Sequence, residues 1–251
     1  PLTATLVPPC ITIVIQICEM LLSLEEGVKS FSVSFSQTGS MIQDIVTANV
    51  LRKMAKHYAE QIGCGDAMIN LVYHQWMGAF PSNKDYSESL INTSTVIASM
   101  VRADKIITKT RDEAFGIPTR ESNAKTVANT QYTLRMLQGI PNITDEQEEE
   151  IVTSEVMSIM EAVFNDKADT LWRKVFNSIK SGIIDVPYSP HIINHNEVVT
   201  VRDKNKNIRI IKKGNLPISD RCFEYEKAQC DLNKDASSIV NDIIHDIGIM
   251  Q

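Results

Sequence analysis

The chain has 251 residues, of which 43% are hydrophobic, with a net charge of −6 and a pI near 5.4. A chain of this size can bury a sizeable core, either as one α/β barrel or as a domain with an extension. The acidic balance excludes the basic surface that polyanion binding needs, so no nucleic-acid partner is expected.

The most apolar run, Ile11 to Leu24, contains Gln16 and Glu19 and is too short to cross a bilayer, so it predicts a buried helix and no membrane association. No secretory signal is apparent. The cysteines are odd in number, scattered and without a Cys-x-x-Cys pair: Cys10, Cys18, Cys64, Cys222 and Cys230. This usage is typical of reduced thiols, and we expect a cytoplasmic protein.

Four short runs have the composition of β-strands: Ala4–Val7, Phe31–Ser36, Met68–His74 and Lys105–Thr110. Each is followed by a helical pattern, and these patterns end near Glu26, Gly63, Ala103 and Leu137. The first three helix starts are marked by Pro8-Pro9, Ser40-x-x-Gln43 and Asp85-x-x-Glu88. Regular alternation of strand and helix predicts a parallel sheet with right-handed crossovers and four adjacent strands in chain order.

This pattern fits a parallel half of a TIM-type (β/α)8 barrel and an open flavodoxin-like sheet equally well. The run Phe31–Ser36 alternates bulky apolar residues with serines, so in a barrel the apolar face would meet the outer helices and the serines would point inward. The helix after Ser40 is expected to bury one apolar stripe, formed by Ile42, Ile45, Val46, Val50 and Met54.

The pattern changes after Pro141, which divides the chain into a half-barrel, 1–141, and a small α+β extension, 142–251. Thr144-x-x-Gln147 opens an acidic helix whose glutamates are expected to be solvated. A second helix is expected at Leu171–Ile179 and an extended crossing at Ile183–Asn196. A β-hairpin follows, formed by Val198–Val201 and Ile208–Ile211. Two further helices, Ser219–Lys227 and Ser237–Ile247, close the chain.

The most informative stretch is Lys105 to Pro118, because it places charged residues in the loop after a predicted strand. In parallel α/β folds such loops face the ligand, so Lys109 and Glu113 are candidate site residues; an exposed ion-pair group is the alternative. His74 and Trp76 fit either core packing or function. His191 and His195 have no carboxylate or cysteine at ligand spacing and predict no zinc site.

Several segments together resemble one known family. They are LVPP from Leu6, EEGVKSFS from Glu25, HQWMGAFP from His74, TKTRDEAFGIPT from Thr108 and GIIDVPYSP from Gly182. They are similar to the epsilon subunit of glutamate mutase, also called methylaspartate mutase. The resemblance covers nearly the whole chain but only the C-terminal half of that subunit, so this chain is expected to be a fragment or one piece of a split enzyme.

The resemblance implies a barrel and an adenosylcobalamin-dependent radical isomerase that interconverts (S)-glutamate and (2S,3S)-3-methylaspartate. Matching positions assign Lys109 and Glu113 to the adenosyl ribose, place Lys105 nearby and make Phe80 and Ile117 lining residues. The resemblance also implies two partners besides the amino-acid substrate: a small subunit that holds the cobalamin, and an N-terminal barrel half that carries the substrate-binding arginines and the catalytic glutamate. Arg102, Arg111 and Arg120 fall in the wrong elements to replace those arginines.

Asp242-x-x-His245-x-x-Gly248 nearly matches the motif that supplies a histidine to cobalt, but its first spacing is one residue too long. We therefore expect no cobalt ligand in this chain and weak cobalamin binding by the chain alone. Two alternatives remain open. One is a catalytically inactive half-barrel that pairs with a cobalamin-binding subunit as an assembly module, and the other is an unrelated α/β enzyme.

Overall fold

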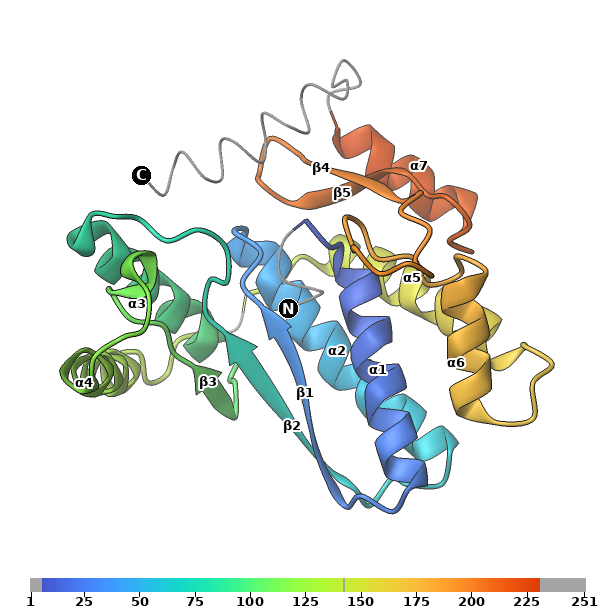
Figure 1. The fold of residues 1–251 in the computed structure, drawn as a ribbon, viewed down its shortest axis with the longest axis horizontal. Coiled ribbons are helices and arrows are strands. Elements are labelled where there is room, and N and C mark those ends of the chain that lie inside the picture. Colours follow the sequence, from blue (N-terminus) through green and yellow to red (C-terminus); the bar gives the residue numbers. More distant parts are fainter. Residues whose placement is uncertain (1–5, 142, 231–251) are drawn as a thin grey trace.

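A computed structural model describes residues 6–141 and 143–230 (Figure 1). Its main sheet has three parallel strands in the order β1-β2-β3, with bounds Ser30–Ser36, Met68–His74 and Lys105–Ile107. A separate antiparallel pair, β4 and β5, spans Val199–Arg202 and Ile208–Lys212. The α/β class, the parallel direction and the chain order of these three strands are confirmed, and so is the hairpin. A barrel remains a prediction.

Seven α-helices and one short 3-10 helix lie within the described residues: α1 Pro9–Glu25, α2 Met41–Gln61, α3 Lys84–Met100, η1 Glu113–Phe115, α4 Arg120–Met136, α5 Glu146–Phe164, α6 Leu171–Lys180 and α7 Asp220–Gln229. Figure 1 shows α1 and α2 beside β1, α3 and α4 near β3, and α7 next to the β4–β5 hairpin. None of these helices is long and apolar enough to cross a membrane.

The start of the chain differs in part from the prediction. Ala4 and Thr5 lie outside the described residues, while Leu6 and Val7 belong to no strand, so the predicted first strand is wrong for its described half. The helix after it is confirmed. It begins with Pro9 directly after Pro8, where a missing N–H costs nothing, and the chain leaves it at Gly27 with a φ of 90°.

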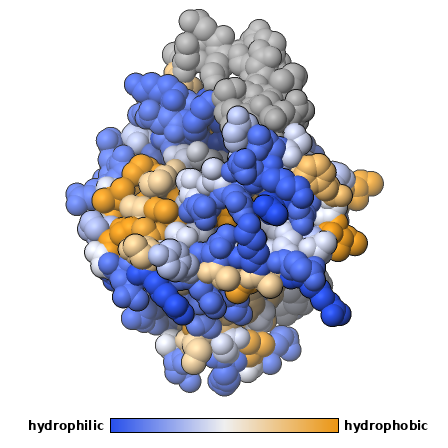
Figure 2. Space-filling view, turned by 90° about the vertical axis from the view of Figure 1, so that its left-hand side faces the viewer, coloured by the Kyte–Doolittle hydropathy of each residue, from blue (hydrophilic) through white to orange (hydrophobic). Residues whose placement is uncertain are grey.

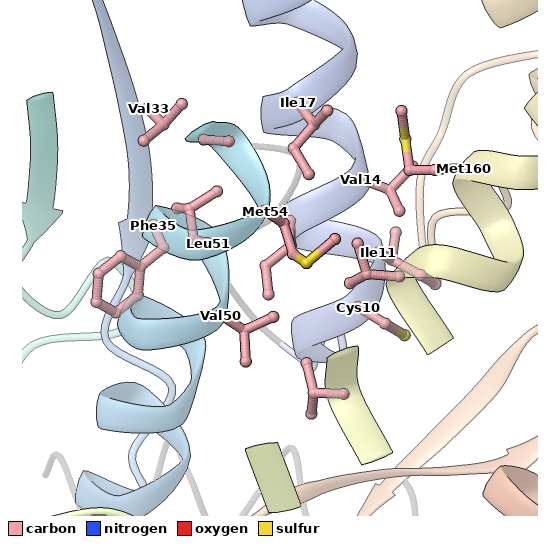
Figure 3. Packing of buried hydrophobic residues seen from close by; sticks show 14 of the residues in the cluster. Cys10, Ile11, Val14, Ile17, Val33, Phe35, Val50, Leu51, Met54 and Met160 are labelled. Atoms are coloured by element: carbon pink, nitrogen blue, oxygen red, sulfur yellow. The ribbon is translucent and has the colours of Figure 1, made fainter. Parts of the chain in front are cut away.

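The alternation of β1 directs its apolar residues into the core. Val33 and Phe35 are 1% and 2% exposed, and Figure 3 shows Phe35 pointing toward α2, near Leu51. The same core contains residues of α1 and α5, such as Ile11 and Met160, so it continues across Pro141. The proposed division into 1–141 and 142–251 stays a prediction.

The start of α2 corrects two expectations. Ser40 caps the helix by accepting a bond from the backbone N–H of Gln43, as predicted. The Gln43 side chain does not return to Ser40; it donates to the carbonyl of Ile208 (3.1 Å) and accepts from its N–H (2.8 Å). Ile42 is 38% exposed and leaves the predicted apolar stripe, whose other members are buried.

Two other predicted caps lie at different residues. Helix α3 is capped by Asn83, which accepts from the N–H groups of Asp85 and Tyr86, so Asp85 is inside the helix. Helix α5 is capped by Asp145 and not by Thr144. Asn and Asp cap as readily as Ser and Thr, and local sequence did not distinguish these neighbours.

The acidic turn of α5 is not entirely solvated. Glu148 is 3% exposed and accepts two hydrogen bonds from Arg209, at 2.7 and 2.8 Å. Helices α6 and α7 are confirmed, whereas the segment Ile183–Asn196 contains turns and is not the continuous extended crossing that was expected. The predicted last helix, Ser237–Ile247, and the Asp242-His245-Gly248 motif lie outside the described residues.

Candidate functional site

The strands β2 and β3 end side by side. His74, the last residue of β2, is in register with Ile107, the last residue of β3. The loops that follow therefore leave the same edge of the sheet, and they carry Trp76 and Lys109. Carboxyl ends of parallel strands are the usual place for ligand-binding groups.

Lys109 and Glu113 meet in the loop after β3. Their Nζ and Oε2 atoms are 3.4 Å apart, with 25% and 22% of the two side chains exposed. The other carboxylate oxygen of Glu113 accepts from the backbone N–H of Thr110 at 3.3 Å. One ammonium and one carboxylate thus lie together, half-buried and within reach of solvent.

The other predicted site residues differ in position and exposure. Lys105 is exposed at the first position of β3, in register with Val72, and therefore at the opposite end of that strand from Lys109. Ile117 is 98% exposed. Phe80 is partly buried in the loop after β2. Their roles beside a cofactor stay predictions.

His74 lies at the edge of the site with an altered acidity. Half-burial lowers its pKa below the ordinary value, and the positive charge of Lys109 lowers it further. The imidazole is therefore neutral near pH 7, able to donate from one nitrogen and accept at the other.

Trp76 is a packed residue. It is 3% exposed, and its Nε1 donates to the carbonyl of Ala79 at 2.9 Å. Gly78 lies under the indole: a Cβ built there would be 2.7 Å from the ring. Only glycine lets the backbone pass this close without displacing Trp76, so the loop after β2 is shaped around the ring.

One face of the parallel sheet is only partly covered by the described residues. In the register of the three strands, Ser32, Asn70 and Lys105 belong to the same face as Met68 and Ile107. Met68 is 63% exposed and Ile107 is 39% exposed. Val72, on the same face, is 6% exposed. Parallel sheets normally bury both faces, and the described residues cover this one only in part.

Of the other candidate residues, Arg111 lies in the loop that carries Lys109 and Glu113, and the rest lie in other elements. Arg102 follows α3, Arg120 is the first residue of α4, and Arg111 lies 4.0 Å from Glu88. His195 bonds the carbonyl of Lys180 through Nε2. Within the described part of the chain, no three His, Cys, Asp or Glu side chains are grouped to hold a metal, and all five cysteines are free thiols.

Two residues at the edge, Gln37 and Gln75, were not among the predicted site residues. Each stands directly after a strand, and their side chains are 4% and 0% exposed. The available signal was position: a polar residue immediately after the last strand residue lies where parallel α/β folds place functional groups.

Comparison with known proteins gives one consistent answer. The family described as Methylaspartate mutase E chain (MutE) matches residues 1–238. The glutamate mutase epsilon subunit of Treponema denticola is 36% identical over 233 residues, which are 91% of this chain and 48% of that protein. Those of Escherichia coli O157:H7 and Halobacterium salinarum are 35% and 31% identical, over 98% and 94% of this chain and 53% and 49% of their own lengths. The chain thus spans about half the length of the curated relatives it matches.

Proposed function

Since the chain belongs to the methylaspartate mutase E chain family, we propose that it is part of an adenosylcobalamin-dependent mutase. The proposed reaction is the radical rearrangement between (S)-glutamate and (2S,3S)-3-methylaspartate. The curated relatives named above are glutamate mutase epsilon subunits, and their greater length is consistent with this chain supplying the C-terminal half of such a subunit.

The observation that carries the proposal is the Lys109–Glu113 pair at the carboxyl edge of the sheet. A carboxylate can accept from two ribose hydroxyls, and an ammonium can donate to ribose oxygens, so the pair fits the adenosyl group chemically. When bound, adenosylcobalamin supplies an adenosyl radical that takes a hydrogen atom from the substrate. Glu113 and Lys109 would hold the ribose, and the neutral His74 would add a polar group beside them.

Two partners complete the proposal. The first is a separate small subunit that holds the cobalamin, as the resemblance to glutamate mutase implies. The second is an N-terminal half-barrel, which would cover the exposed part of the sheet face and supply the substrate-binding arginines.

Figure 2 shows apolar side chains among polar ones on the side of α3 and α4, where Tyr132 and Met136 are 66% and 69% exposed. We place the assembly in the cytoplasm.

The test is turnover in an assembly of this chain, the N-terminal half of the Treponema denticola relative and a cobalamin-binding subunit. Glu113→Gln keeps the shape but weakens charge-assisted hydrogen bonds worth about 1.5–3 kcal/mol. Turnover should therefore fall about tenfold to hundredfold, while the KM for glutamate changes little.

Glu60→Gln is the matched control, because Lys56 and Glu60 form an ion pair with the same spacing on α2, away from the site. It should leave turnover unchanged. Wild-type turnover in the Glu113→Gln assembly would show instead that Lys109 and Glu113 are only an exposed ion pair.

The alternative is an assembly module without catalysis. Two guanidinium groups approach the described loops at this edge, and both have protein partners: Arg111 lies 4.0 Å from Glu88, and Arg202 donates to the carbonyls of Lys206 and Thr38. This function predicts that the chain binds the cobalamin subunit but that no assembly with an arginine-bearing N-terminal half turns over glutamate.

A further inference from the structure

Two glutamines extend the parallel sheet beyond the ends of its strands. Gln37 follows the last residue of β1, and Gln75 follows the last residue of β2. Their backbone N–H groups continue the ladder by one step: Gln37 donates to His74 (3.0 Å) and Gln75 donates to Ile107 (3.2 Å). The two residues thus occupy equivalent positions on adjacent strands.

Beyond this step, the side chains of the two glutamines accept the hydrogen bonds that backbone carbonyls accept within the sheet. The Oε1 atom of Gln37 accepts from the N–H of Trp76 (3.2 Å), and Oε1 of Gln75 accepts from the N–H of Lys109 (2.8 Å). In both cases a side-chain amide oxygen takes the place of the next ladder carbonyl. Each glutamine therefore fixes the first residues of the neighbouring loop.

Helix α3 contacts both amides and fixes the orientation of that of Gln75. Gln75 Nε2 donates to the carbonyl of Ile91 (3.3 Å) and to the hydroxyl of Thr95 (3.2 Å), and Ser94 donates its hydroxyl to Oε1 of Gln37. A backbone N–H can only donate and a carbonyl can only accept, so the amide of Gln75 cannot be flipped without losing bonds on both sides.

We propose that Gln75 is a positioning residue of the site: by accepting from the backbone of Lys109 it fixes where the Lys109–Glu113 pair stands. Gln37 does the same for Trp76. The consequence for turnover rests on the proposed function, whereas the positioning of the loop does not. Because Thr110, the next residue, donates to Glu113, anchoring Lys109 also orients the carboxylate.

The first test measures amide hydrogen exchange at Lys109 by NMR in this chain. Gln75→Met keeps the length of the side chain but removes the acceptor. Exchange at Lys109 should become about five- to tenfold faster, the change expected for one lost hydrogen bond. Unchanged exchange would overturn the proposal.

Gln43→Met is the matched control. Gln43 is also buried, at 1% exposure, and also bonds a distant backbone segment, at Ile208. This substitution should lower stability to a similar degree, yet leave exchange at Lys109 unchanged. Equal acceleration in both variants would mean general loosening of the fold and would also overturn the proposal.

The second test measures turnover in the assembly described above. Because loss of position costs rate more than affinity, kcat should fall about tenfold or more in Gln75→Met, with little change in the KM for glutamate. Gln43→Met should retain wild-type kcat below its melting temperature. An unchanged kcat in Gln75→Met would refute the positioning role.

Gln75→Glu supplies a variant that restores the contact under defined conditions. A neutral carboxyl group can accept from Lys109 and donate to Ile91, as the amide does, whereas an ionised one faces the Ile91 carbonyl with no proton to donate. Turnover relative to wild type should therefore be highest at acidic pH and fall as pH rises. A pH-independent ratio would contradict the proposal. If the wild-type assembly shows no turnover, the proposed function fails, and exchange at Lys109 still decides whether Gln75 positions the loop.

Discussion

Two groups of ion pairs in this molecule have similar chemistry but different surroundings. In the C-terminal part, Arg209 bonds Glu148 (2.7 Å), Asp203 (2.9 Å) and Glu226 (3.3 Å), and all four side chains are 2–5% exposed. At the sheet edge, Lys109 and Glu113 form one pair at 3.4 Å, with about a quarter of each side chain exposed. The buried charges of the Arg209 cluster stabilise the fold, whereas the partly exposed charges at the sheet edge can bind a ligand.

Burial explains the difference. The Arg209 cluster connects α5, the hairpin and α7, and its three carboxylates outnumber the one guanidinium. Burial raises the pKa of Glu226 to about 7, so part of the excess charge is neutralised by a proton. The pair at the edge stays partly hydrated, and either partner can exchange its bond for a ligand at little cost.

The largest expected effect is that of Arg209→Met. It leaves three buried carboxylates without their cation, which costs about 3–5 kcal/mol of the free energy of unfolding. Urea denaturation at pH 7 measures this loss. Arg173→Met is the control, because its pair with Asp169 is largely exposed, and we expect less than about 1 kcal/mol there. Equal losses in both variants would contradict the contrast between the two regions.

The second prediction concerns the pH dependence of the cluster. The pKa of Glu226 is about 7 in the fold and 4.5 as its ordinary value, so between these pH values the folded chain binds more protons than the unfolded chain. This stabilisation is complete below about pH 4.5 and is lost as pH rises to 7, by up to about 3 kcal/mol. In Glu226→Gln the unfolding free energy should fall less between pH 5 and pH 8 than in the wild type. The same pH slope in both proteins would exclude a proton at Glu226.

The smallest expected effect is that of Glu113→Gln on stability. Because the pair is partly solvated, the unfolding free energy should change by about 0–1 kcal/mol, and the melting temperature only slightly. Thermal denaturation of this chain alone measures it. A loss above about 2 kcal/mol would place Lys109 and Glu113 with the fold-stabilising charges and weaken their assignment to a ligand.

Sequence patterns predicted most elements because their causes are local. The bounds of β2 follow from a run of strand-forming residues, and α7 follows its Ser219 cap, whose hydroxyl accepts from Cys222. The Lys109–Glu113 pair could be predicted for the same reason, since four residues separate its members within one loop. The caps of α3 and α5 were misplaced by one or two residues, because several capping residues stand next to one another.

What only the tertiary structure decided are contacts between distant segments. Glu148 stands among other glutamates and is therefore predicted to face solvent. It is buried instead, because it bonds Arg209, which is 61 residues away in the sequence. In the sequence, Gln75 is one polar loop residue among several. Only the packing of β2 against β3 and α3 places its side-chain oxygen where it accepts from the backbone N–H of Lys109. The sequence by itself determined the helices, the strands and the loop that carries the charges, because these depend on near neighbours. Which charges are buried, and which glutamine holds which loop, depends on desolvation and on partners that only the folded chain brings together.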